Sequence, residues 1–171
     1  GAINLVADAG RRGTRASASY EVGSCGTYRT TLAGQHYHAP SGLFARVNAF
    51  CDLARNDYPI DVEVADERGR LVPATVTRFH DAYRAHGVGG EIGIVDRSWA
   101  KRLSLRVYTT EAEKELQNNL TMTVKYGDVS YDEASRGATL RYRSPSFGPS
   151  DHPLWVEAAA GYAYRSTDFV D

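Results

Sequence analysis

The chain has 171 residues, of which 42% are apolar, a length that favours one domain with a substantial core. Its 20 basic and 21 acidic side chains leave a net charge of −1, so no long-range field draws it onto nucleic acid or an anionic membrane surface. No apolar run approaches the roughly 18 residues of a membrane helix, so no membrane span is expected.

The N-terminal part of the chain is expected to be an arm. Residues 1–17 begin with a short apolar stretch and continue with Gly and Arg, which allows one strand at most. From residue 18 onward, short runs rich in Val, Thr and Tyr alternate with Gly, Pro and Asp, as is typical of short strands in a closed or sandwiched sheet. The sequence therefore predicts a mostly β protein.

The clearest strand prediction is a hairpin over residues 60–79. Residues 60–64 alternate apolar and polar side chains, which gives one apolar face at a period of two. The turn is expected at residues 66–69, because Gly69 can adopt the positive φ that a tight hairpin needs. Residues 72–79 are expected to return as the partner strand.

The middle of the chain predicts two short helices around further strands. Residues 86–90 (HGVGG) predict a loop, and residues 98–103 predict a short helix capped by Asp96. Residues 111–120 contain helix formers and favour at most a short surface helix. The other expectations are strands at 92–95, 105–108, 121–134, 138–144 and 156–170, with a loop rich in Pro, Gly and Ser at 144–153.

The two cysteines, Cys25 and Cys51, stand in segments that are both expected to be ordered. An even count of cysteines, few Met and many Tyr are typical of a secreted protein with one disulfide. Such a bond would contribute about 3 kcal/mol in the chain-entropy model. Two buried thiols in a cytosolic protein are the alternative interpretation.

A series of short motifs follows a fixed order between residues 25 and 105. They are Pro40-Ser41-Gly42, Phe44, Asn48-Ala49-Phe50, the hairpin from Ile60 to Arg70, Val76 to Asp81, the Gly-rich residues 86–90, and Ile94 to Ser98 before Trp99 to Leu103. This order resembles the double-psi β-barrel of the rare lipoprotein A family, whose wider relatives are expansins and barwin-like proteins. The resemblance implies a barrel-like domain at 18–108 and a β-rich extension at 109–171 packed on it. A β-sandwich of the immunoglobulin or pilin type is the alternative fold.

The resemblance also implies a glycan site. It places Asp81 as an acid/base group and, if one residue is inserted, Asp96 as a second carboxylate, the arrangement that lytic-transglycosylase-like cleavage of a glycosidic bond requires. His80 stands where the family has Asn, and Ala54 stands where lytic members have His. These departures favour glycan binding or wall loosening over cleavage, and they leave enzymatic activity open. The alternative is that both carboxylates only cap turns.

Aromatic and imidazole side chains supply further candidate ligands. Tyr28, Tyr37 and Tyr83 are expected to line the groove beside His80, because aromatic rings stack on sugar faces; ordinary strand propensity is the alternative. His36-Tyr37-His38 is an H-x-H pattern whose two imidazoles would share one side of a strand, as metal ligands can. The sequence contains no P-loop, dinucleotide fingerprint or Cys-x-x-Cys pair, and no cofactor is expected.

The predicted function is therefore binding or modification of a cell-wall polysaccharide in an acidic, tyrosine-lined groove of a secreted protein, extracellular or periplasmic. The alternative is a structural subunit of an extracellular filament or surface assembly. Such subunits join by β-strand addition, here through residues 2–9. This alternative predicts self-assembly that deletion of residues 2–9 abolishes.

Overall fold

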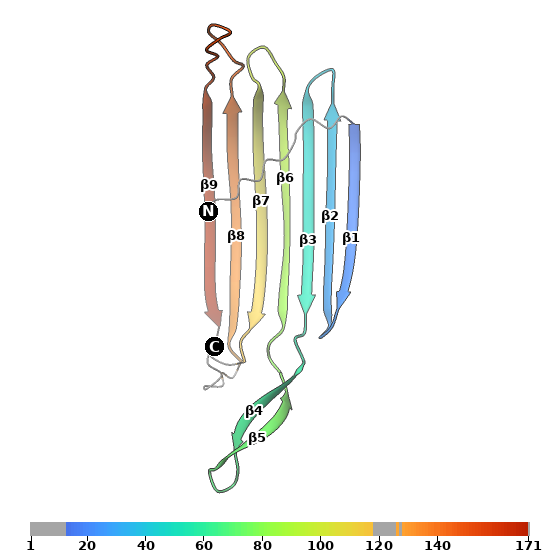
Figure 1. Ribbon diagram of the computed structural model, residues 1–171, viewed down its shortest axis with the longest axis vertical. Helices are drawn as coiled ribbons and strands as arrows, with labels where there is room; N and C mark the ends of the chain where they lie inside the picture. Colours follow the sequence, from blue (N-terminus) through green and yellow to red (C-terminus); the bar gives the residue numbers. More distant parts are fainter. Residues whose placement is uncertain (1–12, 118–125, 127, 171) are drawn as a thin grey trace.

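The computed structural model describes residues 13–117, 126 and 128–170, and these residues form a protein of β-strands (Figure 1). The described residues contain no helix, so the prediction of a mostly β protein is confirmed. The strands are β1 (Gly13–Gly23), β2 (Thr27–His38), β3 (Leu43–Ala54), β4 (Pro59–Ala65), β5 (Leu71–Thr77), β6 (Tyr83–Val95), β7 (Arg102–Glu115), β8 (Ser130–Arg143) and β9 (Glu157–Val170).

Seven strands form one antiparallel sheet in the order β1-β2-β3-β6-β7-β8-β9 (Figure 1). In the described part of the chain, β1 and β9 are the two edges, and no register joins them. The expectation of a closed barrel is therefore wrong for these residues, because every strand pairs only with its antiparallel neighbours. The alternative sandwich is not formed either, since the described strands supply no second sheet packed on this one.

The β4–β5 hairpin lies outside the large sheet and projects beyond one of its ends (Figure 1). Its strands and turn confirm the sequence prediction. The Asp66 carboxylate accepts hydrogen bonds from the backbone amides of Arg68 and Arg70, both at 2.9 Å, and Gly69 has a φ of 74°. The turn is thus specified by residues adjacent in sequence.

The two predicted helices and the Gly-rich loop are wrong. Residues 86–90 lie within β6, residues 98–101 form a turn before β7, and residues 111–115 belong to β7. The part of 111–120 beyond residue 117, and residues 121–125 of a predicted strand, lie outside the described residues. The predicted loop at 144–153 and the final strand are both found. Tyr108, the expected end of the first domain, lies inside β7, and the same sheet continues through β9.

Aromatic rings pack on directly opposite glycines at three places in the sheet, two between β3 and β6 and one between β7 and β8. These pairs are Phe44 with Gly93, Phe50 with Gly87, and Tyr108 with Gly137. A Cβ placed on any of these glycines would lie only 2.6–2.7 Å from the opposite ring. Such cross-strand packing fixes the register of neighbouring strands. It explains why β6 accommodates Gly87 and Gly93, although glycines otherwise predict a loop.

Few side chains in the described sheet are buried. The buried hydrophobic residues are Phe44, Ala85, Val95 and Ala100. The accessible surface is 12444 Å², whereas a folded monomer of 18.8 kDa exposes about 8,300 Å² by the usual scaling. The sheet is therefore one layer thick and exposes far more surface than a globular chain of its size.

Candidate functional site

Asp81 is held in an ionic cluster where the chain returns from the hairpin to β6. Its carboxylate is 8% exposed and lies 2.5 Å from Lys114 Nζ and 3.1 Å from Arg78 Nε. The contact with Arg78 is electrostatic, because that N–H lacks the alignment of a hydrogen bond. Asn56 donates a hydrogen bond to the Asp81 carbonyl at 2.9 Å. These partners give Asp81 a structural role in joining the hairpin to the sheet.

His80 lies in the same junction but faces other partners. Its φ is 49°, its Nε2 lies 3.0 Å from the Val129 carbonyl, and its Nδ1 lies 3.8 Å from Glu115. The Glu115 carboxylate also accepts a hydrogen bond from the Ala82 amide at 3.0 Å. The junction thus brings charged and polar groups from several segments into close contact.

Asp96 lies at the opposite end of β6 from Asp81. It occupies a turn with a φ of 56°, its carboxylate is 57% exposed, and it pairs with Lys101. The 13 residues of β6 separate the two carboxylates by more than about 40 Å. The structure therefore does not bring Asp81 and Asp96 together, and the pair lacks the spacing of about 5–9.5 Å that glycosidic cleavage by two carboxylates needs.

The three candidate groove tyrosines do not line one groove. Tyr28 pairs with Leu53 on one face of the sheet. Tyr37 pairs with Phe44 on the other face, because side chains alternate between the two faces along β2 and β3. Tyr83 lies at the far end of β6, opposite Lys114. An acidic groove formed by these residues is not present among the described residues.

His36 and His38 share one face of β2, as the H-x-H pattern predicts, but each imidazole has its own partner. His36 Nδ1 lies 2.7 Å from the Thr14 hydroxyl, and His38 Nδ1 lies 2.7 Å from the Ser41 hydroxyl. In the described ranges, no three His, Cys, Asp or Glu side chains meet in an arrangement that could hold a metal ion.

The predicted disulfide is not formed, and Cys25 and Cys51 are free thiols. The Cys25 carbonyl accepts hydrogen bonds from the amides of Arg55 and Asn56 at 3.2 and 3.1 Å. Cys25 therefore lies beside Arg55, and Cys51 precedes Arg55 by four residues. Four residues of extended strand span about 13 Å. This separation exceeds the Cα distance of about 7 Å that a disulfide can bridge.

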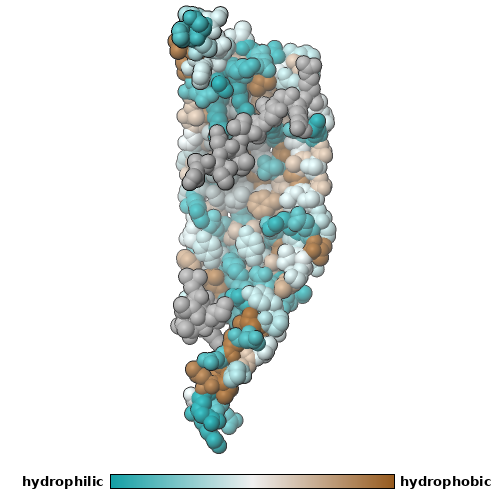
Figure 2. Space-filling view, in the orientation of Figure 1, coloured by the Kyte–Doolittle hydropathy of each residue, from teal (hydrophilic) through white to brown (hydrophobic). Residues whose placement is uncertain are grey.

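The two faces of the sheet carry different kinds of side chain. The register assigns each side chain to a face, because directly opposite residues share a face. One face, here called the polar face, carries a network around Glu91. Glu91 lies 2.5 Å from Arg102 and 3.9 Å from Arg46, and both guanidinium groups lie over the Phe44 ring. Further ion pairs join Arg29 to Asp52 and Arg165 to Glu133. Figure 2, viewed from the side of Figure 1, shows hydrophilic and intermediate side chains spread over much of the visible sheet.

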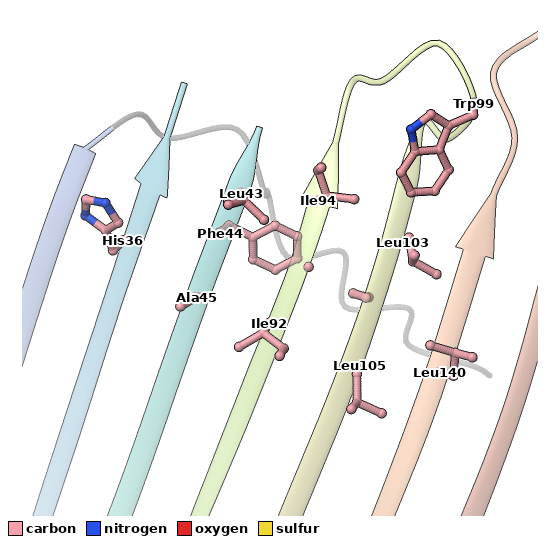
Figure 3. Close-up of a pocket in the computed structure, with 12 residues that line it drawn as sticks. His36, Leu43, Phe44, Ala45, Ile92, Ile94, Trp99, Leu103, Leu105 and Leu140 are labelled. Atoms are coloured by element: carbon pink, nitrogen blue, oxygen red, sulfur yellow. The ribbon is translucent and has the colours of Figure 1, made fainter. Parts of the chain in front are cut away.

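The opposite face carries aliphatic and small side chains. Figure 3 shows this face, because the strands run in the reverse left-to-right order of Figure 1, and the labelled aliphatic side chains project toward the viewer, whereas Phe44 belongs to the polar face. We call the following set the apolar band: Ala16, Ala18, Leu32, Gly34, His36, Leu43, Ala45, Val47, Ala49, Val88, Gly90, Ile92, Ile94, Leu103, Leu105, Val107, Ala138, Leu140, Ala158, Ala160 and Tyr162.

Large side chains of the apolar band are exposed. Val47 is 53% exposed, Ile92 62% and Val107 48%. Two shallow hollows lie along the band, one of about 580 Å³ between β2 and β8 and one of about 490 Å³ over β1 to β3. The first is bordered by Trp99 (Figure 3). Within the band, His36 is the sole titratable side chain apart from the Tyr162 hydroxyl. This continuous exposed surface is the candidate functional site.

Charged side chains mark one end of the apolar band on the same face. They include two cross-strand ion pairs, Arg84 with Glu113 at 3.9 Å and His86 with Glu111 at 3.4 Å. Asp132 and Asp168 continue this row on β8 and β9. A polar hollow of about 520 Å³ lies among these groups. This row of charged side chains thus forms the boundary of the apolar band on β6, β7, β8 and β9.

The apolar band was not predicted, although its signal is present in the sequence. Residues 43–53 alternate Leu, Ala, Val, Ala, Cys and Leu with Phe, Arg, Asn, Phe and Asp. A period of two over so long a segment indicates a strand with one apolar face. The interpretation of these residues as separate short motifs concealed the alternation.

The comparisons with known proteins identify no relative: no protein-family model, curated protein or solved structure matches this chain. Within residues 13–117, 126 and 128–170, no helix has the length and apolarity needed to cross a membrane.

Proposed function

We propose that this protein is a structural component of a larger assembly, in which its sheet is extended by strands added at β1 and β9. The observation that carries the proposal is the open sheet with two long edges. The edge strands have 11 and 14 residues, and neither contains Pro or Lys, the residues with which soluble proteins commonly protect an exposed edge. An added strand would satisfy the free backbone groups of each edge.

The thin, surface-rich sheet supports the same proposal. Its accessible surface exceeds that of a compact monomer by about half, and burial of such surface is the main driving force of association. Binding of a cell-wall glycan and an extracellular or periplasmic location stay predictions. In the described residues, the glycan hypothesis lacks a groove that joins Asp81, Asp96 and the candidate tyrosines.

Cysteine cross-linking at the edges tests the proposal. In a background with Cys25→Ser and Cys51→Ser, Ser17→Cys places a thiol on β1 and Ala163→Cys places one on β9, both on the polar face. If second copies pair through these edges, mild oxidation should give covalent dimers in mixtures of the two variants. Ser135→Cys on the interior strand β8 is the matched control and should stay monomeric. A monomeric mass in solution, with no edge cross-link, would contradict the proposal.

A further inference from the structure

The apolar band offers a covering partner few groups with which to form hydrogen bonds. A patch of this extent on a water-exposed monomer is unusual, because exposed apolar patches rarely exceed a few hundred Å². The occupant can be a second sheet, another protein or the acyl chains of lipids. Protein interfaces carry about one hydrogen bond for each 100–200 Å², together with Arg and other polar anchors. The band offers His36 and the Tyr162 hydroxyl, which is too few for a polar protein partner of its size.

The length of the strands favours lipid. The seven strands of the large sheet have 11 to 14 residues, about twice the usual strand length. On β3, the apolar side chains extend from Leu43 to Leu53, and a tilted strand of about 9–11 residues crosses the hydrocarbon core of a bilayer.

The apolar surface is also inclined to the strands. On β1 it reaches Val22, which is 65% exposed near the end bearing the β1–β2 turn. On β9 it reaches Ala158, near the opposite end of the sheet. The charged groups at Arg84 and His86 begin correspondingly earlier on β6. A level hydrocarbon layer produces such an oblique band when the strands cross it at a tilt, as transmembrane strands do.

Amphipathic aromatic side chains occur at both limits of the surface. Trp99 and Tyr142 lie together at one end, where the Tyr142 hydroxyl donates to the Trp99 carbonyl at 2.7 Å. Tyr20 and Tyr28 stack near the other end with ring centroids 6.5 Å apart. Tyr and Trp favour the boundary between hydrocarbon and water, because their rings are apolar and their N–H or O–H groups are polar.

We propose that the apolar band contacts the acyl chains of a lipid bilayer, so that the strands of the large sheet lie across the membrane and the polar face turns away from lipid. The inference rests on the proposed function, because a sheet edge within hydrocarbon must be paired with another strand. Added strands at β1 and β9 meet this requirement.

Spin labels on adjacent residues test the proposal with the full chain in dioleoylphosphatidylcholine vesicles. In the background without Cys25 and Cys51, single cysteines replace Val47 and Val107 on the apolar band, and Asn48 and Arg106 on the polar face. All four positions are exposed, so the labels perturb packing little. Collisions with oxygen, which concentrates in the bilayer, are compared with collisions with a water-soluble nickel chelate.

The labels at 47 and 107 are expected to favour oxygen over nickel, and the ratio is expected to reverse at 48 and 106. Nickel access at all four positions would place both faces in water and overturn the proposal. Low access to both reagents at 47 and 107 would show a protein partner on the band, which would overturn the lipid proposal while leaving the assembly proposal intact. The edge cross-links report separately on the proposed function.

A flotation assay adds a measurement that does not depend on labels. The double variant Val47→Asp with Val107→Asp should lose co-flotation with the vesicles, because charges on a lipid-facing strand are costly. The matched double variant Asn48→Asp with Arg106→Asp should float like the unaltered chain. Equal flotation of the two double variants, or absence of the unaltered chain from the vesicle fraction, would contradict the proposal.

Discussion

The ring of Phe50 lies against the backbone of Gly87, its direct partner across β3 and β6. A Cβ at position 87 would stand 2.6 Å from Phe50 Cε1 and 2.7 Å from the Thr110 methyl carbon. Gly90, three residues further along the same strand, faces the other side of the sheet, where a Cβ would have the Arg46 carbonyl oxygen as its nearest neighbour, at 3.6 Å. The two glycines of one strand thus have opposite steric environments.

Gly87→Ala is expected to destabilise the protein by about 1–3 kcal/mol, because the added methyl group displaces the ring that sets the β3–β6 register. Gly90→Ala is the matched control and should be neutral or slightly stabilising, since alanine loses less conformational entropy than glycine on folding. Denaturant unfolding of the two variants measures the difference. Equal midpoints would contradict the role of the Phe50–Gly87 contact.

Asp81→Asn should destabilise the protein by about 3 kcal/mol, because it leaves the charges of Lys114 and Arg78 without their buried carboxylate. Asp96→Asn removes a charge from an exposed pair and should change stability by less than about 1 kcal/mol. Unfolding curves of the two variants make the comparison. A larger loss for Asp96→Asn would refute the structural role that the ionic cluster gives to Asp81.

The hairpin turn should respond to acid through Asp66. The backbone N–H of Arg70 lowers the pKa of this carboxyl most; desolvation opposes the shift, and the Arg70 side chain and the Arg68 N–H reinforce it. Because the folded pKa lies below the unfolded value of about 3.9, Asp66 stabilises the turn above that pH. This stabilisation is lost as the pH falls through the folded pKa.

The amide signals of Arg68 and Arg70 should shift during that titration, as followed by NMR, and Asp66→Asn should abolish the shift. Glu67→Gln changes a neighbouring carboxyl in the same turn and should leave the titration intact. Amide shifts that persist in the Asp66→Asn protein would contradict the prediction.

Both cysteines should be reduced in the purified protein. Iodoacetamide added in denaturant without a reductant is expected to give two adducts by mass spectrometry, because Cys25 and Cys51 lie too far apart to be bonded. Adducts that form only after reduction would show that a disulfide links them.

The sequence predicted the β4–β5 hairpin correctly because its determinants are local: an alternating strand, an Asp that accepts turn amides and a glycine with positive φ. The role of Gly87 was not predictable in the same way. A glycine inside a strand has the sequence signature of a loop until its cross-strand partner, Phe50, is known. Such partners are distant in sequence and depend on register.

The candidate site shows the same division between local and distant information. The shared side of His36 and His38 follows from the strand period alone. The separation of Asp81 from Asp96 depends on residues 83–95 being one uninterrupted strand, which the glycines at 87, 89 and 90 conceal. The apolar band likewise depends on the alignment of all seven strands. Alternation within one strand predicts that this strand has an apolar face, but it does not predict which strands lie beside it.

The β4–β5 hairpin interrupts a meander whose strands otherwise follow one another in order, yet β3 and β6 pair as directly as any other neighbours. The hairpin strands contact each other and no strand of the large sheet. Since the entropy of closing a loop rises by only about 0.6 kcal/mol for each doubling of its length, this connection can be extended at the β4–β5 turn, away from the Asp81 cluster, at little energetic cost. The protein therefore has a position at which new chain can be inserted during evolution or engineering while the register of the sheet is preserved.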